Sequence, residues 1–327
     1  MEARYSGFFC DVPGFLLGNN QDIPGGTGVT VIRCPEGTVG GGEVRGGAPG
    51  SRETDLLRPE NTVQNVHAVV LAGGSAFGLA ACDGVMKRLK EENIGFETGY
   101  GVVPIVPGCV LFDRGVGDAD AFPTAEMGYR ACRFASNDEN SHRMGNIGAG
   151  TGCSVGKLHG ADRAMKSGLG QASMSKGDLV VSAVVCVNAL GDVFDFLRDN
   201  EPIAGLLQEN MWYDSTVANL QATFCPNLEG RNTTIGVIAC NAKLDKASCL
   251  KLAQMAQDGY ARSIRPVHTP ADGDTIFTLA GGEKECDLLT IGVMAQEAMQ
   301  RAVVNACLCA ETAYGLPSYS FLQQNRQ

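Results

Sequence analysis

The chain has 327 residues, of which 44% are hydrophobic and 43 are glycine, and its formal net charge is −10. This length allows one large domain or two ordinary ones, and the hydrophobic content supports a substantial core and excludes wholesale disorder. The negative charge and the lack of a long Lys/Arg run exclude nucleic acid as an expected partner, because a phosphate backbone would be repelled.

The sequence also predicts where the protein is located, the state of its cysteines and whether it binds a metal. No apolar stretch reaches the roughly 18–20 residues of a membrane span, and residues 1–7 do not match a signal peptide, so we expect a soluble cytoplasmic protein without a membrane partner. The 13 cysteines are scattered and form no C-x-x-C pair, which predicts reduced and mostly buried thiols. The four histidines lie far apart, so no metal site is expected.

Hydrophobic patterning predicts strands and helices in alternation along the first part of the chain. Loop chemistry opens the segment 8–34, and the expected elements then follow in order: strands over 28–34, 39–47 and 67–72, a helix over 76–92, extended segments over 102–107 and 109–112, and a short helix over 127–134. The glycine turn at 73–75 could present amide N–H groups to an anion or a carbonyl oxygen, although a plain tight connection is the favoured interpretation of this turn alone.

A glycine-rich run over 145–158 invites comparison with a phosphate-binding loop. Such a loop needs Gly five residues before the Gly-Lys pair and Ser or Thr after the Lys, but those positions hold Thr151 and Leu158. The run also follows no clear buried strand, as a dinucleotide fingerprint would. We therefore expect no nucleotide cofactor, and a glycine-rich wall beside a substrate is the favoured interpretation.

The longest apolar run, over 179–189, predicts a buried strand that ends at Asn188. There the Asn188 amide could donate a hydrogen bond to a nearby site, or it could simply begin a turn. Residues 199–230 are polar and lack periodicity, which predicts an exposed connector that tolerates chain cleavage.

The step Asn232–Thr233 comes next and opens a strand over 233–240. A Thr hydroxyl is a weak nucleophile that needs a base beside it, and a free α-amino group, with a pKa near 7.7–8, is a usable base. Cleavage before Thr233 would therefore place nucleophile and base in one residue. The alternative is a turn that merely leads into a strand.

The remaining pattern predicts a helix over 245–261, a loop over 266–274 that leads into a strand, and a long apolar helix over 291–313. In the loop, Asp272 and Asp274 flank Gly273.

Several segments together resemble the L-aminopeptidase/D-esterase family, which includes the β-aminopeptidases. The matching motifs are Gly28–Ile32, Val44–Gly50, Arg52–Asp55, Leu71–Leu79, Gly145–Gly152, Val187–Ala189, Asn232–Val237 and Asp272–Thr275. The resemblance implies an α/β fold, a four-layer αββα sandwich of the type shared with ornithine acetyltransferase. It also implies one domain over 1–327, which cleaves itself into a large subunit, 1–232, and a small subunit, 233–327.

The same resemblance assigns roles to individual residues. Thr233 is the implied nucleophile, Asn188 the oxyanion-stabilising side chain, and Asp272 and Asp274 the polar pair near the nucleophile's amine. Implied too are a small peptide or an aminoacyl amide or ester as substrate, no cofactor, and a homo-oligomer, a tetramer in the family. The chain departs from the family at Asn19, where a His is frequent, and the catalytic Tyr of some members has no match here.

Two other functions fit the same residues. An acyltransferase would pass the acyl group from Thr233 to an amine, and it would then require a second substrate for turnover. A binding protein would keep the glycine-rich pocket and stay uncleaved.

Overall fold

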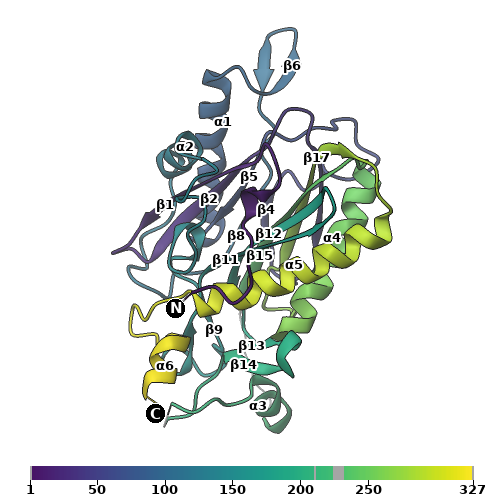
Figure 1. Ribbon diagram of the computed structural model, residues 1–327. Helices are drawn as coiled ribbons and strands as arrows, with labels where there is room; N and C mark the ends of the chain where they lie inside the picture. The colour runs from purple at the N-terminus through teal and green to yellow at the C-terminus, as the bar shows by residue number, and fades with distance from the viewer. Residues whose placement is uncertain (1, 210, 224–231, 326–327) are drawn as a thin grey trace.

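The computed structural model describes residues 2–209, 211–223 and 232–325. Two five-stranded sheets lie face to face, and helices cover the outer face of each sheet (Figure 1). Three layers of buried side chains separate these four layers. The α/β class and the αββα sandwich predicted from the sequence are confirmed.

The first sheet is built from the N-terminal third of the chain. Its strands in spatial order are β1 (Leu16–Asp22), β2 (Thr27–Arg33), β5 (Ala68–Ala72), β8 (Gly108–Val110) and β4 (Gly50–Arg52). All neighbours pair antiparallel except β5 and β8. Helices α1 (Ala81–Glu91) and α2 (Ala125–Arg133) cover its outer face, where Val29, Val70 and Val85 share one cluster.

The second sheet holds the site. Its strands in spatial order are β11 (Leu169–Lys176), β12 (Leu179–Asn188), β15 (Thr233–Ala242), β17 (Thr275–Lys284) and β3 (Val39–Val44). Helices α4 (Lys246–Ser263) and α5 (Leu288–Leu308) lie along its outer face (Figure 1). Strand β15 pairs with β17 in parallel, and α4 connects the two strands.

Strand β15 is buried on both faces, which explains its continuous apolar sequence. Ile235 and Val237 point into the core between the two sheets, whereas Ile238 and Cys240 join the cluster under α4 and α5. The strand is therefore held in the centre of the molecule, and its first residue is fixed in space.

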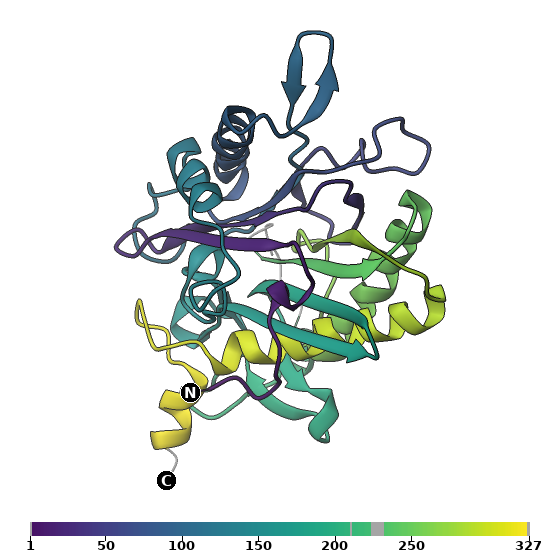
Figure 2. The same ribbon diagram turned by 45° about the horizontal axis from the view of Figure 1, so that its top comes forward.

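Short elements complete the chain. They are β6 (Phe96–Thr98), β7 (Gly101–Val103), β9 (Ser154–Val155), β10 (Met165–Lys166), β13 (Asp192–Asp195), β14 (Glu201–Ala204), β16 (Ile264–Arg265), α3 (Thr216–Ala222) and α6 (Tyr319–Asn325). The β6–β7 hairpin projects from the body of the molecule, which a second view shows clearly (Figure 2). Among the described residues, no helix is both apolar enough and long enough to cross a bilayer.

The structure corrects four sequence predictions. The loop chemistry expected before residue 28 gives way to β1, because its polar residues pair with β2 across the full length of both strands. The connector expected over 199–230 contains β14 and α3, while 224–231 lie outside the described residues. The helix expected over 76–92 begins as a 3-10 turn, Ser75–Ala80, and the helix expected to reach 313 ends at Leu308.

Candidate active site

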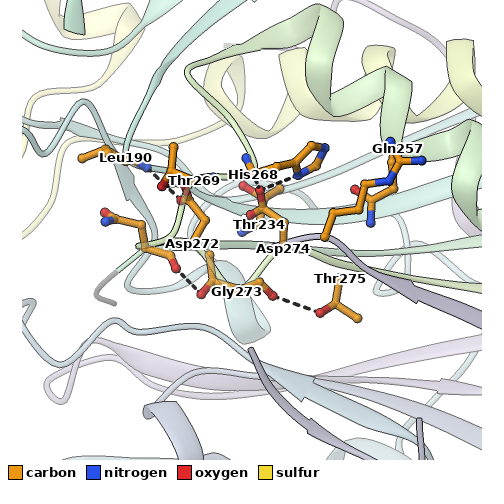
Figure 3. A network of polar contacts seen from close by, with 12 residues as sticks. Leu190, Thr234, Gln257, His268, Thr269, Asp272, Gly273, Asp274 and Thr275 are labelled. Atoms are coloured by element: carbon orange, nitrogen blue, oxygen red, sulfur yellow. Dashed lines mark hydrogen bonds and ion pairs between the residues drawn. The ribbon is translucent and has the colours of Figure 1, made fainter. Parts of the chain in front are cut away.

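Strand pairing brings the predicted site residues together from distant parts of the sequence. Thr233 begins β15 and lies opposite Asn188, the last residue of β12. On its other side, Asn232 forms an isolated parallel bridge with Asp272, just before β17. Figure 3 shows Asp272 and Asp274 on either side of Gly273 in this loop. The site is thus built on the ends of three neighbouring strands.

The peptide group between Asn232 and Thr233 is held from two directions. Gly273 N–H donates to the Asn232 carbonyl oxygen at 3.1 Å, and the Thr233 hydroxyl donates to the same oxygen. Asn232 N–H in turn donates to the Ala271 carbonyl at 3.4 Å. The carbonyl carbon that a nucleophile would attack is therefore fixed beside a hydroxyl, with an amide N–H on its oxygen.

Asp274 is almost fully buried and accepts three N–H donors. Its Oδ1 accepts from Thr234 N–H at 2.7 Å. Its Oδ2 accepts from His268 twice, from the backbone N–H at 3.0 Å and from Nδ1 at 2.9 Å. This carboxylate ties the loop before β17 to the residue that follows Thr233.

Asp272 is equally buried but holds a weaker set of donors. Its Oδ2 accepts from the N–H of Thr269, at 3.1 Å, and from the Thr269 hydroxyl, and its Oδ1 accepts from Leu190 N–H at 3.5 Å. Burial, and then the nearby charge of Asp274, raise the pKa of Asp272 to about 6. Asp272 therefore keeps its proton to a higher pH than an exposed aspartate does.

Asn188 reaches the site, and both ends of its side chain have partners. Its Nδ2 donates to the Phe112 carbonyl at 2.7 Å, and its Oδ1 accepts from Ser154 N–H at 3.1 Å and from Lys157 Nζ at 2.9 Å. One of the two Nδ2 hydrogens is engaged by Phe112. The role of Asn188 as an oxyanion donor stays a prediction.

Lys157 is a functional candidate that the sequence analysis missed. Its Nζ donates to the carbonyl and to the Oδ1 of Asn188, both at 2.9 Å. Burial lowers the pKa of Lys157 to about 8. The sequence analysis tested this lysine only as part of a phosphate-binding loop. A single Lys that follows an apolar, glycine-rich run was the available signal, because such a lysine is buried with it and acquires a perturbed pKa.

A pocket of about 400 Å³ opens beside this group of residues. Its apolar lining includes Phe112, Val116, Leu158, Leu190 and Leu316. Its polar lining includes Asp113, Ser154, Lys157 and Asn232. Because Asn232 itself forms part of the wall, the pocket lies next to the Asn232–Thr233 step.

The described residues contain no group of three His, Cys, Asp or Glu side chains placed to bind a metal ion.

Comparison with known proteins identifies the family. The sequence model of peptidase family S58 matches residues 8–319. The chain belongs to peptidase family S58. It is 44% identical over 315 residues to an uncharacterized aminopeptidase of Mycobacterium leprae, covering 89% of this chain and 85% of that protein. It is 30% identical over 314 residues to a 6-aminohexanoate-oligomer endohydrolase of Paenarthrobacter ureafaciens, covering 90% and 84% of the two chains.

Solved structures agree on the fold. The L-aminopeptidase D-Ala-esterase/amidase of Ochrobactrum anthropi, described as a variant of the Ntn-hydrolase fold, superposes with a TM-score of 0.71 at 17% identity, covering 100% of this chain and 94% of that one. A β-aminopeptidase of a Burkholderia species gives 0.68 at 20% identity, covering 99% and 94%. The S58 member described here is a hydrolase with this fold.

In this S58 hydrolase a hydroxyl and an N–H donor meet on one carbonyl oxygen, that of Asn232. Lys157, whose pKa is lowered by burial, lines the same pocket as Asn232, and Asp272 and Asp274 add two buried carboxyls. Hydroxyl, amine and carboxyl groups of this kind are the ones that amide-hydrolysing sites use.

Proposed function

We propose that this chain is an amidase of the aminopeptidase type that cleaves itself between Asn232 and Thr233. The observation that carries the proposal is the placement of the Thr233 hydroxyl and of Gly273 N–H on the one Asn232 carbonyl. Cleavage would divide a single-domain precursor into a large subunit, 1–232, and a small subunit, 233–327. Thr233 would then act on substrates from its new N-terminus.

Self-cleavage needs a base other than the Thr233 amine, because that nitrogen is still part of a peptide bond. Lys157 is assigned this role, since its pKa of about 8 leaves a usable neutral fraction and since it lines the pocket with Asn232. Thr233 Oγ1 attacks the Asn232 carbonyl carbon, the hydroxyl proton passes to Lys157, and Gly273 N–H stabilises the oxyanion. The C–N bond then breaks as the nitrogen takes up a proton, which leaves an ester on Oγ1. Water hydrolyses this ester to the Asn232 carboxylate and the free hydroxyl.

Turnover repeats the same chemistry on an external amide or ester. The free Thr233 amine, with an ordinary pKa near 7.7–8, accepts the hydroxyl proton as Oγ1 attacks the substrate carbonyl. Asp272 and Asp274 orient that amine, while Asn188 and Gly273 N–H hold the oxyanion. The leaving amine or alcohol takes the proton, and water then releases the acyl group.

The substrate proposed is a small peptide or an aminoacyl amide or ester. The acyl group would occupy the position of Asn232, against the mostly apolar wall of the pocket. Relatives named as aminopeptidases and as 6-aminohexanoate-oligomer endohydrolases both act on amides, which supports this class. Assembly of several copies, as a tetramer, is part of the proposal, and light scattering coupled to size-exclusion chromatography tests it.

A mass spectrum of the purified protein tests the central claim. We expect two fragments that divide before Thr233, and a Thr233→Ala variant that stays uncut and hydrolyses no aminoacyl amide. Thr233→Ser, which keeps a hydroxyl, should still cleave. A wild-type chain that stays whole and inactive on long incubation would instead identify an uncleaved binding protein, and an active Thr233→Ala variant would place the nucleophile elsewhere.

A further inference from the structure

His268 supplies two of the three donors on Asp274, but the mechanism above gives it no role. It lies in the loop before β17, with a backbone φ of +55°, in the left-handed region that few non-glycine residues adopt. Its side chain is 17% exposed, and the carboxylate it meets is 1% exposed. The imidazole, which is partly exposed, therefore contacts a carboxyl group that is almost fully buried (Figure 3).

The two oxygens of the Asp274 carboxylate accept hydrogen bonds from different parts of the chain. On Oδ2, the backbone N–H and Nδ1 of His268 converge at 3.0 and 2.9 Å. On Oδ1, Thr234 N–H donates at 2.7 Å, one residue after the nucleophile. The Asp274 carboxylate therefore links His268 to the start of β15 through hydrogen bonds on both of its oxygens.

The hydrogen bonds define which imidazole nitrogen carries the proton. A carboxylate oxygen only accepts, so the contact at 2.9 Å requires a proton on Nδ1. Nε2 is buried and has no hydrogen-bond partner among the described residues. The ring packs on Tyr260, with 6.3 Å between the ring centroids. Among the described residues, Nδ1 is thus the ring nitrogen of His268 that forms a hydrogen bond.

The contact with His268 also makes the hydrogen bonding of Asp274 different from that of Asp272. Asp274 accepts three N–H donors within 3.0 Å, whereas the donors on Asp272 include one as distant as 3.5 Å. Burial, and then the nearby charge of Asp274, raise the pKa of Asp272 to about 6.

We propose that His268 is a positioning residue, whose Nδ1–H fixes the Asp274 carboxylate and, through Thr234 N–H, aims Thr233 at the Asn232 carbonyl. The inference rests on the proposed function, since it concerns the geometry of self-cleavage and turnover. His268 itself touches neither the peptide bond that is cut nor the pocket.

Three substitutions of the full-length chain test this role. His268→Gly removes the imidazole and suits the left-handed backbone, so it adds no strain. His268→Asn tolerates the same backbone and places an N–H donor near the position of Nδ1. His67→Ala is the matched control, because it removes another partly buried imidazole, which lies just before β5 of the first sheet and whose Nδ1 accepts from Ile105 N–H at 3.0 Å.

Self-cleavage is followed by intact mass, and turnover of the cleaved enzyme by steady-state kinetics on an aminoacyl p-nitroanilide. We expect His268→Gly to slow self-cleavage by about tenfold or more and to lower kcat with KM little changed, because the loss falls on a hydrogen bond to a buried charge. For His268→Asn, the self-cleavage rate and kcat should stay within about threefold of the wild-type values. For His67→Ala, both should equal the wild-type values.

Two results would overturn the inference. One is wild-type cleavage and turnover by His268→Gly; the other is an Asn variant as slow as the Gly variant, which would assign the effect to ring packing.

Should His268→Gly fail to fold, His268→Gln replaces it, because its longer side chain carries the amide past the Nδ1 position. Equal rates for Gln and Asn would then count against the role. An uncut wild-type chain would refute the proposed function itself, whereas a normally cleaved wild type beside an unimpaired His268→Gly refutes only this step.

Discussion

Gly273 offers the sharpest single-residue perturbation of the site, because one methyl group would contact both Thr233, the proposed nucleophile, and a fixed part of the backbone. A Cβ at this position would lie 2.7 Å from the Ala48 carbonyl oxygen and 2.9 Å from Thr233 Oγ1. Both distances are shorter than real Cβ contacts, and Ala48 N–H is itself bonded to the Asp272 carbonyl at 2.8 Å. The loop that carries Gly273 must therefore move.

The size of the effect follows from the bond that this movement breaks. Gly273 N–H now lies 3.1 Å from the Asn232 carbonyl oxygen. A shift of about half an ångström would lengthen the contact to about 3.6 Å, which is no longer a hydrogen bond. Loss of one oxyanion donor costs about 2.7–4 kcal/mol in the transition state, or about 10²–10³ in rate. We expect Gly273→Ala to slow self-cleavage by at least about a hundredfold.

The assay is the fraction of uncut chain over time, measured by denaturing gel and intact mass. Gly99→Ala is the matched control, because Gly99 lies in the β6–β7 turn and a Cβ there would have no atom within 4 Å. A Tm near that of the uncut Thr233→Ala variant would show that Gly273→Ala folds. Wild-type cleavage by a folded Gly273→Ala would refute the assignment of this N–H as the oxyanion donor.

Three further predictions concern the ionisable groups. Lys157→Met keeps an unbranched side chain but removes the proposed base, so self-cleavage followed by intact mass should slow by about 10²-fold or more; an unchanged rate would place the base elsewhere. Because burial lowers the pKa of Lys157 to about 8 and the base must be neutral, the wild-type self-cleavage rate should rise with pH, reach half its maximum near pH 8 and level off above. A rate that falls between pH 7 and 9 would contradict this. The pKa of Asp272 is raised from 3.8 to about 6, so the folded chain holds that proton more tightly than the unfolded chain, and the free energy of unfolding should fall as pH rises from about 4 to about 6. On a Thr233→Ala background, Asp272→Asn should flatten this decline in Tm, and identical curves for the two proteins would count against the shift.

The secondary structure around the site was predictable because its strands are buried on both faces. The strands expected over 179–189 and 233–240 match β12 and β15 closely, since long runs of Val and Ile leave little choice of conformation. β1 was missed for the opposite reason. Its sequence, Leu-Leu-Gly-Asn-Asn-Gln-Asp, has no apolar alternation, and its strand conformation comes from pairing with β2.

The contacts within the site were predictable only in part. Asn188, Asp272 and Asp274 were named from a family resemblance, and the structure brings all three near Thr233. The partners of Asn188 were not predictable, because Phe112 and Lys157 come from separate loops. The sequence signal for Lys157 was its place after an apolar, glycine-rich run, and the size of its pKa shift depends on burial that only the folded chain provides.

The sequence by itself determined that a small polar step, Asn232–Thr233, opens a buried strand, and that two carboxyls flank a glycine further along the chain. The tertiary structure decided that Gly273 N–H reaches the carbonyl before Thr233, and that His268 holds Asp274. The physical reason is register. Parallel pairing of β15 with β17 sets Asn232 beside Asp272. Hydrogen bonds between the two strands depend on this register, and local sequence patterns do not specify which residues of distant segments pair.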